Sequence, residues 1–219
     1  MNEKQGISIG TCILWVFGYF CIMLLYTFIN MFLWRRVPPN ISEWGNVVTI
    51  IICSGAYFWL LIRSWQLNIS NMLKLNYQEV VLAVICSVAF FLLMDCFIDP
   101  IIEKAFPVSE RNYQEIVASL KENPITSAIQ VCIIAPIAEE LLMRGFALEL
   151  LKKRYGIGIA LIVSTLLFAL LHFNMVQTLS ALITGFILGL LYLKTKSLAS
   201  TILAHGLYNL ASLIALVML

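Results

Sequence analysis

The chain has 219 residues, of which 61% are hydrophobic and only 12% are charged, and its mean hydropathy is +0.93. Soluble domains are roughly 45–50% apolar and 25% charged, so this composition excludes an ordinary soluble globular domain. The formal net charge is +2, and the charged residues are spread thinly along the chain. No block is basic enough to bind nucleic acid, which excludes a nucleic-acid partner.

Apolar stretches of about 20 residues recur along almost the whole chain, and each can cross the hydrocarbon core of a bilayer as a helix. The first is too long for the hydrophobic region of a signal peptide and is expected to be a retained span. The sequence therefore predicts an all-α polytopic membrane protein, a bundle of about seven transmembrane helices. The expected spans lie near residues 8–34, 44–62, 79–98, 124–150, 157–173, 175–193 and 197–218.

The short loops indicate how the chain is oriented. Lysines and arginines favour the cytoplasmic side of a membrane, and the basic cluster at 152–154 is the strongest anchor on the same side as the N-terminus. An N-terminus in the cytoplasm is therefore predicted. Membrane lipid is an expected partner, whereas the oligomeric state does not follow from the sequence.

Three charged residues interrupt the fourth apolar stretch. A charge at mid-bilayer costs about 2.5–3.5 kcal/mol on insertion scales. Glu140 and Arg144 are four residues apart on one helix face, so the two can neutralise each other as a structural pair. Glu139 lies about 100° further round the helix and has no cation at helical spacing. It must be protonated, pair with another helix, or bind water or a metal ion.

The only two histidines of the chain also lie in apolar stretches. His172 follows Phe168 by four residues and His205 precedes Asn209 by four, so each pair shares one helix face. Carboxylates and imidazoles together can hold a divalent metal with a bound water, or can deprotonate water directly. An asparagine can donate to a developing oxyanion. The sequence contains neither HExxH nor GxSxG, so a zincin helix and a serine nucleophile elbow are not expected.

Helix rise gives a first estimate of depth. Counted from the basic cluster at about 1.5 Å per residue, Glu139 lies about 21 Å and His172 about 27 Å into the membrane. His205, counted from Lys196, lies only about 13 Å in. The last helix must tilt, shift or begin later for His205 to join the other two.

Three short motifs share an order on successive spans: EELLMR (Glu139 to Arg144), FALLH (Phe168 to His172) and HGLYN (His205 to Asn209). They resemble the EExxxR, FxxxH and HxxxN signatures of the CAAX-protease and bacteriocin-processing (CPBP, Abi) intramembrane endopeptidases. The resemblance covers about residues 126–219, and the three motifs together are specific although each alone is weak.

The resemblance implies a membrane endopeptidase of seven or eight helices. By it, Glu139 is the carboxylate that activates water and His172 is its partner, acting alone or through a metal. The implied cofactor is a divalent metal, zinc in the first instance, with Glu139, His172 and His205 as its expected ligands.

The other motif residues receive supporting roles from the same resemblance. Glu140 is grouped with the catalytic residues and is interpreted as forming an ion pair with Arg144. His205 and Asn209 match residues expected to bind metal or to stabilise the oxyanion, and Phe168 supports the histidine that follows it.

The expected organisation has two parts. Hydropathy alone gives 1–123 as N-terminal transmembrane helices with a polar interfacial linker, and the resemblance implies that 124–219 is a catalytic core of four transmembrane helices. The predicted activity is that of a CAAX-protease-like endopeptidase, which cleaves a peptide or a prenylated protein. The expected setting is a bacterial plasma membrane, with a role in bacteriocin immunity or peptide processing.

Two other functions stay open at this point. One is a non-enzymatic immunity or scaffold protein that keeps the polar cluster for structure or for partner binding. The other is a proton-coupled transporter that uses Glu139 and His172 as a relay, although the sequence shows no internal repeat of the transporter kind.

Four further polar or small residues are not assigned to the site. Asp95 is expected near the end of its span, and Asn174 is expected to cap a helix end. Tyr208 and Gly185 receive no role.

Overall fold

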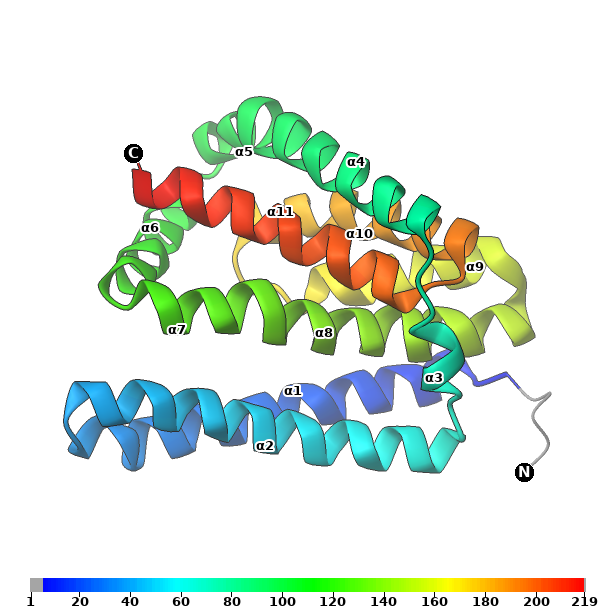
Figure 1. The fold of residues 1–219 in the computed structure, drawn as a ribbon, viewed down its shortest axis with the longest axis horizontal. Coiled ribbons are helices and arrows are strands. Elements are labelled where there is room, and N and C mark those ends of the chain that lie inside the picture. The colour runs from blue at the N-terminus through cyan, green and yellow to red at the C-terminus, as the bar shows by residue number, and fades with distance from the viewer. Residues whose placement is uncertain (1–5, 219) are drawn as a thin grey trace.

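The computed structural model describes residues 6–218, which form an all-helical bundle without strands (Figure 1). The predicted all-α fold class is confirmed. The α-helices of the described chain are α1 (Ile9–Phe32), α2 (Pro39–Trp65), α3 (Ile69–Met72), α4 (Tyr77–Leu93), α5 (Asp99–Ala105), α6 (Pro107–Glu122), α7 (Pro124–Ile129), α8 (Ala135–Glu140), α9 (Glu149–Leu170), α10 (Met175–Thr195) and α11 (Leu198–Met218). A 3₁₀ helix, η1 (Trp34–Arg36), and π-helical segments η2 (Met94–Ile98), η3 (Gln130–Ile134) and η4 (Leu141–Leu148) complete them.

Six continuous helical segments of the described chain are long and apolar enough to cross a membrane. The longest, Pro124–Leu170, has 47 residues and contains the fourth predicted span and most of the fifth. The chain turns inside it at Gly156, whose φ of 81° and ψ of 171° are non-helical and favour glycine. The helices therefore belong to a multi-pass membrane protein.

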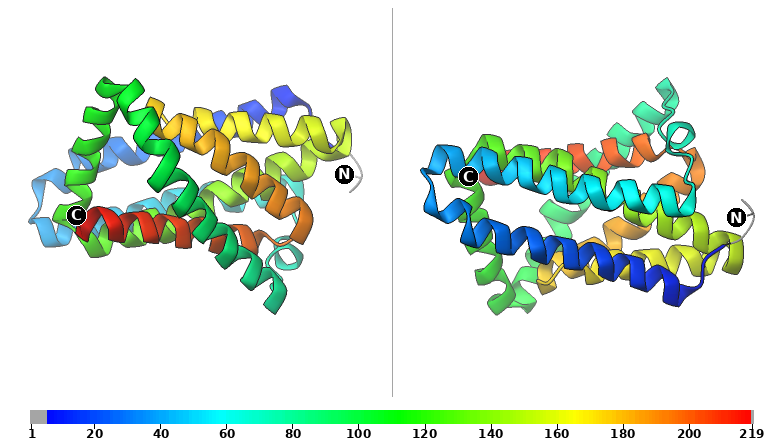
Figure 2. Two further views of the ribbon diagram at one scale, coloured as in Figure 1. Left: turned by 90° about the horizontal axis from the view of Figure 1, so that it is seen from above. Right: turned by 90° about the horizontal axis from the view of Figure 1, so that it is seen from below.

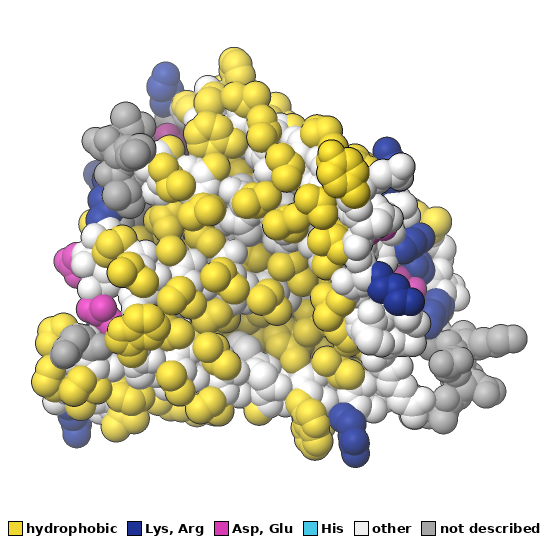
Figure 3. Space-filling view, viewed as in Figure 1, with side chains coloured by type: hydrophobic (Ala, Val, Ile, Leu, Met, Phe, Trp, Pro, Cys, Tyr) yellow, Lys and Arg dark blue, Asp and Glu magenta, His cyan; other side chains and the backbone are white. Residues whose placement is uncertain are grey.

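The surface agrees with this conclusion. Figure 3 shows hydrophobic side chains over the middle of one face, with most charged side chains toward two ends. Large apolar side chains of the spans are exposed, among them Leu14 at 70%, Trp59 at 63% and Leu170 at 67%. Exposure on this scale is unfavourable in water, but it is favourable against lipid chains.

Basic side chains gather at the end of the bundle where α1 begins and α2 ends. Lys74 and Ser197 are in contact there: the Ser197 hydroxyl donates to the backbone carbonyl oxygen of Lys74 at 2.6 Å. Partial burial, and then repulsion from Lys152, hold the pKa of Lys196 below its ordinary value. The basic residues at this end are Arg63, Lys74, Lys152, Lys153, Arg154, Lys194 and Lys196.

Polar side chains cap several helices where the backbone would otherwise leave N–H groups unpaired. The Ser8 hydroxyl accepts from the Thr11 backbone N–H at 3.0 Å at the start of α1. Asn76 and Glu79 form a reciprocal capping box at the start of α4. Asn174 caps α10 by accepting from the Val176 N–H at 3.0 Å, which confirms the predicted helix end cap.

The α1–α2 hairpin lies beside the long helical segment that starts at α7 (Figures 1 and 2). Aromatic side chains fasten the two parts together. The fully buried ring of Phe146 in η4 meets Trp15 of α1 at 6.2 Å and Trp65 of α2 at 6.0 Å between centroids. The N-terminal hairpin therefore packs directly against the segment that follows the two glutamates.

Two π-helical segments, η3 and η4, flank α8, which holds Glu139 and Glu140 at its end. Single π-helical turns inside α-helices are rare and often occur at functional sites. A π turn contains more residues than an α turn, so it rotates the following side chains relative to a regular helix. The local backbone around the glutamates is therefore irregular in the region that the motifs single out.

Small residues let α11 approach this irregular segment closely. A Cβ atom added to Gly206 would lie 2.6 Å from the Cys132 carbonyl oxygen in η3. The obstructing atom belongs to the backbone, so a side chain at position 206 would push the two helices apart. Close approach through small residues is a general device of membrane helix packing.

We expect the substitution Gly206→Ala to lower the free energy of unfolding by about 1–3 kcal/mol, because the added methyl group overpacks the α11–η3 contact. Denaturant titration of the detergent-solubilised protein measures this change. The matched control is Gly55→Ala in α2, where an added Cβ meets no heavy atom within 4 Å. Equal stability of the two variants would contradict the close approach.

Candidate functional site

The site forms where the end of α8 meets the middle of α11. Glu139 and Glu140 come from α8, Arg144 from η4, and His205 from α11. Phe168 and His172 lie at and just beyond the end of α9, and α10 closes the remaining side with Gly185. The structure thus brings residues from all three motifs to one region inside the membrane-spanning part of the bundle.

This region contains a buried ion pair between Glu140 and Arg144. Arg144 Nη1 lies 2.7 Å from Glu140 Oε1, and both side chains are almost completely buried, at 2% and 0% exposure. Arg144 Nη2 also donates to the Gly185 carbonyl oxygen at 2.7 Å. The guanidinium carbon lies 4.8 Å from the centroid of the Phe168 ring, a cation–π distance. The predicted Glu140–Arg144 pair is therefore present and has two further contacts.

His205 lies between the two glutamates. Its Nδ1 is 3.1 Å from Glu140 Oε1, the oxygen that also accepts from Arg144. An ionised carboxylate only accepts hydrogen bonds, so this contact assigns the proton to Nδ1. The other ring nitrogen, Nε2, lies 3.8 Å from Glu139 Oε2. Glu140 therefore orients the ring so that Nε2 faces Glu139.

The two adjacent glutamates differ in access. The Glu140 side chain is fully buried, whereas 23% of the Glu139 side chain is exposed. Of the two carboxylates, only that of Glu139 is therefore open to a molecule approaching from outside the bundle. Their different surroundings follow from the rotation of about 100° between consecutive helical residues.

His172 has a different environment from His205. Its Nδ1 lies 3.0 Å from the Phe168 carbonyl oxygen, which can only accept, so Nδ1 again carries the proton of the contact. Among the described residues, neither glutamate lies within 4.0 Å of His172 as an ion-pair partner. His205, rather than His172, therefore makes the direct contacts with the two glutamates.

The ring of Phe168 connects the two histidines. Its centroid lies 5.1 Å from the His172 ring and 5.9 Å from the His205 ring, both in edge-to-face geometry. It also faces the guanidinium group of Arg144. Phe168 is 2% exposed and thus packs between all three polar side chains.

Asn209 lies one helical turn beyond His205 in α11. Its side-chain Nδ2 donates to the Val131 carbonyl oxygen in η3 at 2.8 Å. This bond ties α11 to the π-helical segment before the glutamates. Only one of the two N–H groups on Nδ2 is needed for the bond, so a second donor stays available.

The residues as placed do not form a three-donor metal site. Among the described residues, no three His, Cys, Asp or Glu side chains gather closely enough to hold one ion. Glu139 and His205 present one oxygen and one nitrogen toward each other, but His172 does not complete this pair. We therefore assign no catalytic step to a metal ion.

One residue of the site was left unassigned by the sequence analysis. Gly185 supplies the carbonyl oxygen for Arg144, and an added Cβ there would lie 2.6 Å from Cδ1 of Phe168. This role depends on the packing of α10 against Arg144, which lies 41 positions earlier in the chain. A single glycine in an apolar segment carries no signal that distinguishes this role.

The fold and site define a class: a helical multi-pass membrane protein with a Glu–Arg–His cluster buried among its spans. Residues 121–211 match the family described as Rce1-like, type II CAAX prenyl endopeptidase Rce1-like. The match covers fewer than half of the 219 residues, and the family that it names is a protease family. The matched residues include all three motifs.

Neither of the other two comparisons adds a relative. No curated protein matches the chain, and no solved structure matches it.

We expect Arg144→Met to lower the free energy of unfolding by about 3–5 kcal/mol, because it leaves the buried Glu140 carboxylate without its cation. Combining it with Glu140→Gln should recover a substantial part of the loss. Denaturant titration in detergent measures both changes.

Lys152→Met is the matched control. The Lys152–Glu149 pair is also close, at 2.6 Å, but its side chains are 19% and 18% exposed. More exposed ion pairs contribute about 0–1 kcal/mol. If the two methionine variants lost similar stability, the buried pair would not have the structural role described above.

Proposed function

We propose that this protein is an intramembrane endopeptidase in which Glu139 activates the water that attacks a peptide bond. The observation that carries the proposal is the unequal pair of glutamates: Glu140 is buried and held by Arg144, while Glu139 is accessible and faces His205 Nε2 at 3.8 Å. The family of the 121–211 domain supports the same reaction class.

In the proposed reaction, Glu139 Oε2 accepts a proton from water as the water oxygen attacks the carbonyl carbon of the peptide bond. The carbonyl oxygen becomes an oxyanion. Glu139 then gives the proton to the amide nitrogen as the carbon–nitrogen bond breaks. Water is thus divided between the two products, a carboxylic acid and an amine.

The other motif residues bind and orient the reactants in this proposal. His172 offers its free Nε2 to the attacking water, which is the partner role that its motif implies. The spare N–H of Asn209 is the donor for the oxyanion. Glu140, Arg144 and Phe168 hold His205 beside Glu139, so they act through another residue.

The proposed substrate class is a membrane-associated peptide or a prenylated protein with a C-terminal CAAX sequence. The name of the matched family supports this class. The proposed setting is a bacterial plasma membrane, with peptide processing or self-immunity to a bacteriocin as the physiological role.

We expect Glu139→Gln to reduce cleavage by at least about 100-fold, because the amide cannot take the proton from water. The assay uses a prenylated peptide ending in CAAX and identifies the released tripeptide by mass spectrometry. His172→Ala should also reduce cleavage strongly.

Glu43→Gln serves as the control, since it makes the same chemical change in α2, away from the motifs. It should retain normal cleavage. Full activity of Glu139→Gln would overturn the assignment of the base. Absence of cleavage by the wild-type protein, combined with protection of cells that survives in Glu139→Gln, would favour the alternative of a non-enzymatic immunity or scaffold protein.

The proposal has a second form, in which Glu139, His172 and His205 would hold a zinc ion, as the family resemblance implies. Each histidine uses Nδ1 for another contact, so Nε2 is the ring nitrogen left for a metal, which binds the neutral imidazole. Movement of His172 toward Glu139 and His205 would be required to complete the predicted ligand set.

Because the three donors are not gathered, we expect dialysis against a chelator to leave cleavage unchanged. Metal analysis of the purified protein should give well under one zinc per chain. Loss of cleavage on chelation and its recovery with zinc, with about one zinc per chain that is absent in His172→Ala, would establish the metal form instead.

A further inference from the structure

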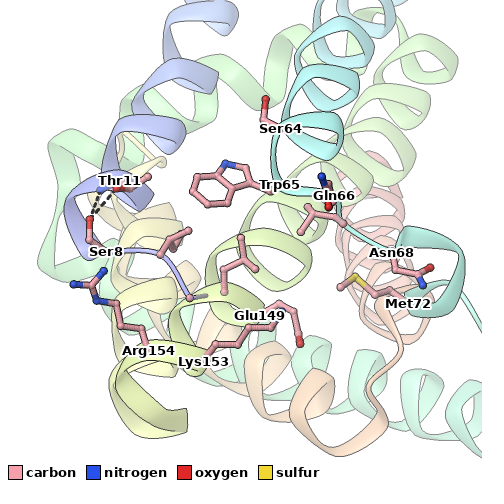
Figure 4. Close-up of a pocket in the computed structure, with 14 residues that line it drawn as sticks. Ser8, Thr11, Ser64, Trp65, Gln66, Asn68, Met72, Glu149, Lys153 and Arg154 are labelled. Carbon is pink, nitrogen blue, oxygen red and sulfur yellow. Dashed lines mark hydrogen bonds between the residues drawn. The ribbon is translucent and has the colours of Figure 1, made fainter. Parts of the chain in front are cut away.

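A pocket of about 550 Å³ (Figure 4) lies at the basic end of the bundle, and neither Glu139 nor Glu140 lines it. Its walls come from the segment leading into α1, the end of α2 with the turn that follows, and the start of α9. Its volume is within the roughly 300–1,000 Å³ of small-molecule sites. The matched motifs contribute none of the residues that line it.

The charge of the pocket is mainly positive. Lys153 and Arg154 line it from the first turns of α9. Glu149 also lines it, but its Oε2 accepts from Lys152 Nζ at 2.6 Å and from the Tyr192 hydroxyl at 2.8 Å. The acid is therefore already compensated by neighbouring groups, and the pocket offers a favourable environment for an anion.

Arg154 is the strongest feature for anion recognition. Its guanidinium group contacts the Tyr155 ring at 5.6 Å, and among the described residues it forms no ion pair. Figure 4 shows its side chain next to Ser8, where α1 begins. A planar guanidinium with free donors matches the geometry of phosphate oxygens.

The pocket is held in shape by backbone packing. A Cβ added to Gly6 would lie 2.6 Å from the Leu150 carbonyl oxygen and 2.7 Å from the Arg154 backbone nitrogen. The segment before α1 therefore packs directly against the turn of α9 that carries Lys153 and Arg154. The positive end of the α1 dipole lies at the same edge and adds to the attraction for an anion.

The position of the pocket identifies the kind of anion. α1 begins and α2 ends beside it, so it lies where these apolar spans leave the hydrocarbon core. Trp65 lines it from the last residue of α2, a position typical of indole rings at the membrane interface. At this level the phosphate groups of lipids are the most abundant anions.

We propose that this pocket binds the phosphate of an anionic phospholipid headgroup, with Arg154 and Lys153 as its cationic contacts. Basic pockets between transmembrane helices on the cytoplasmic side recognise lipid headgroups in this way. The site is independent of the proposed peptidase chemistry, so either can hold without the other.

Native mass spectrometry of the full chain in mild detergent tests the proposal, with phosphatidylglycerol and phosphatidylcholine as probes. Wild-type protein should bind phosphatidylglycerol roughly tenfold more tightly or better. The double variant Lys153→Gln/Arg154→Gln should bind both lipids equally.

The control is Arg63→Gln/Lys74→Gln, which removes the same charge from the same end of the bundle but outside the pocket. It should keep the preference. Equal binding of the two lipids by the wild type, or an equal loss of preference in both double variants, would overturn the pocket as a headgroup site. Complete displacement of phosphatidylglycerol by about 10 mM inorganic phosphate would overturn the lipid as the ligand and leave a free phosphate site.

Discussion

The guanidinium group of Arg144 must keep its donors satisfied inside a membrane, and much of the site is arranged around this requirement. Moving a cation out of water is so unfavourable that it persists only with an opposite charge and good hydrogen bonds. Arg144 obtains the carboxylate of Glu140, the carbonyl of Gly185 and the face of the Phe168 ring. These three groups come from different helices, so the contacts of Arg144 join η4 to α8, α10 and α9.

The same pair determines where His205 lies. Glu140 Oε1 accepts from both Arg144 and His205, so the imidazole of α11 is held by an oxygen that the arginine already fixes. The close contact at Gly206 brings the α11 backbone near enough for this bond. The Glu140–Arg144 pair and the orientation of the His205 ring toward Glu139 are therefore coupled through one carboxylate oxygen.

Much of this arrangement follows from the sequence. Spacing by four residues predicts the Glu140–Arg144 pair, and it is confirmed even though Arg144 lies in a π-helical segment. The depth estimate placed Glu139 with His172 and left His205 too shallow, whereas the structure brings His205 to Glu139. Regular helix rise could not represent π-helical turns or the crossing of α11 over α8, both of which change axial position. Gly185 and Gly206 act through contacts between distant helices, and such contacts leave no local pattern.

Two neighbouring residues of the same type thus acquire different chemistry from their surroundings alone. Glu140 has an arginine and a histidine at one oxygen and no exposure, so its contribution is to hold charge and orientation. Glu139 is turned away from the arginine, keeps part of its surface accessible and faces a ring nitrogen that Glu140 has oriented. Environments that separate the roles of paired carboxylates are a recurrent basis of acid–base catalysis. A purely structural cluster would need Glu140 and its cation Arg144. It would gain little from the accessible carboxylate of Glu139 directed at His205. The energetic cost of keeping Glu139 among apolar spans therefore supports the proposal of a reaction that uses it.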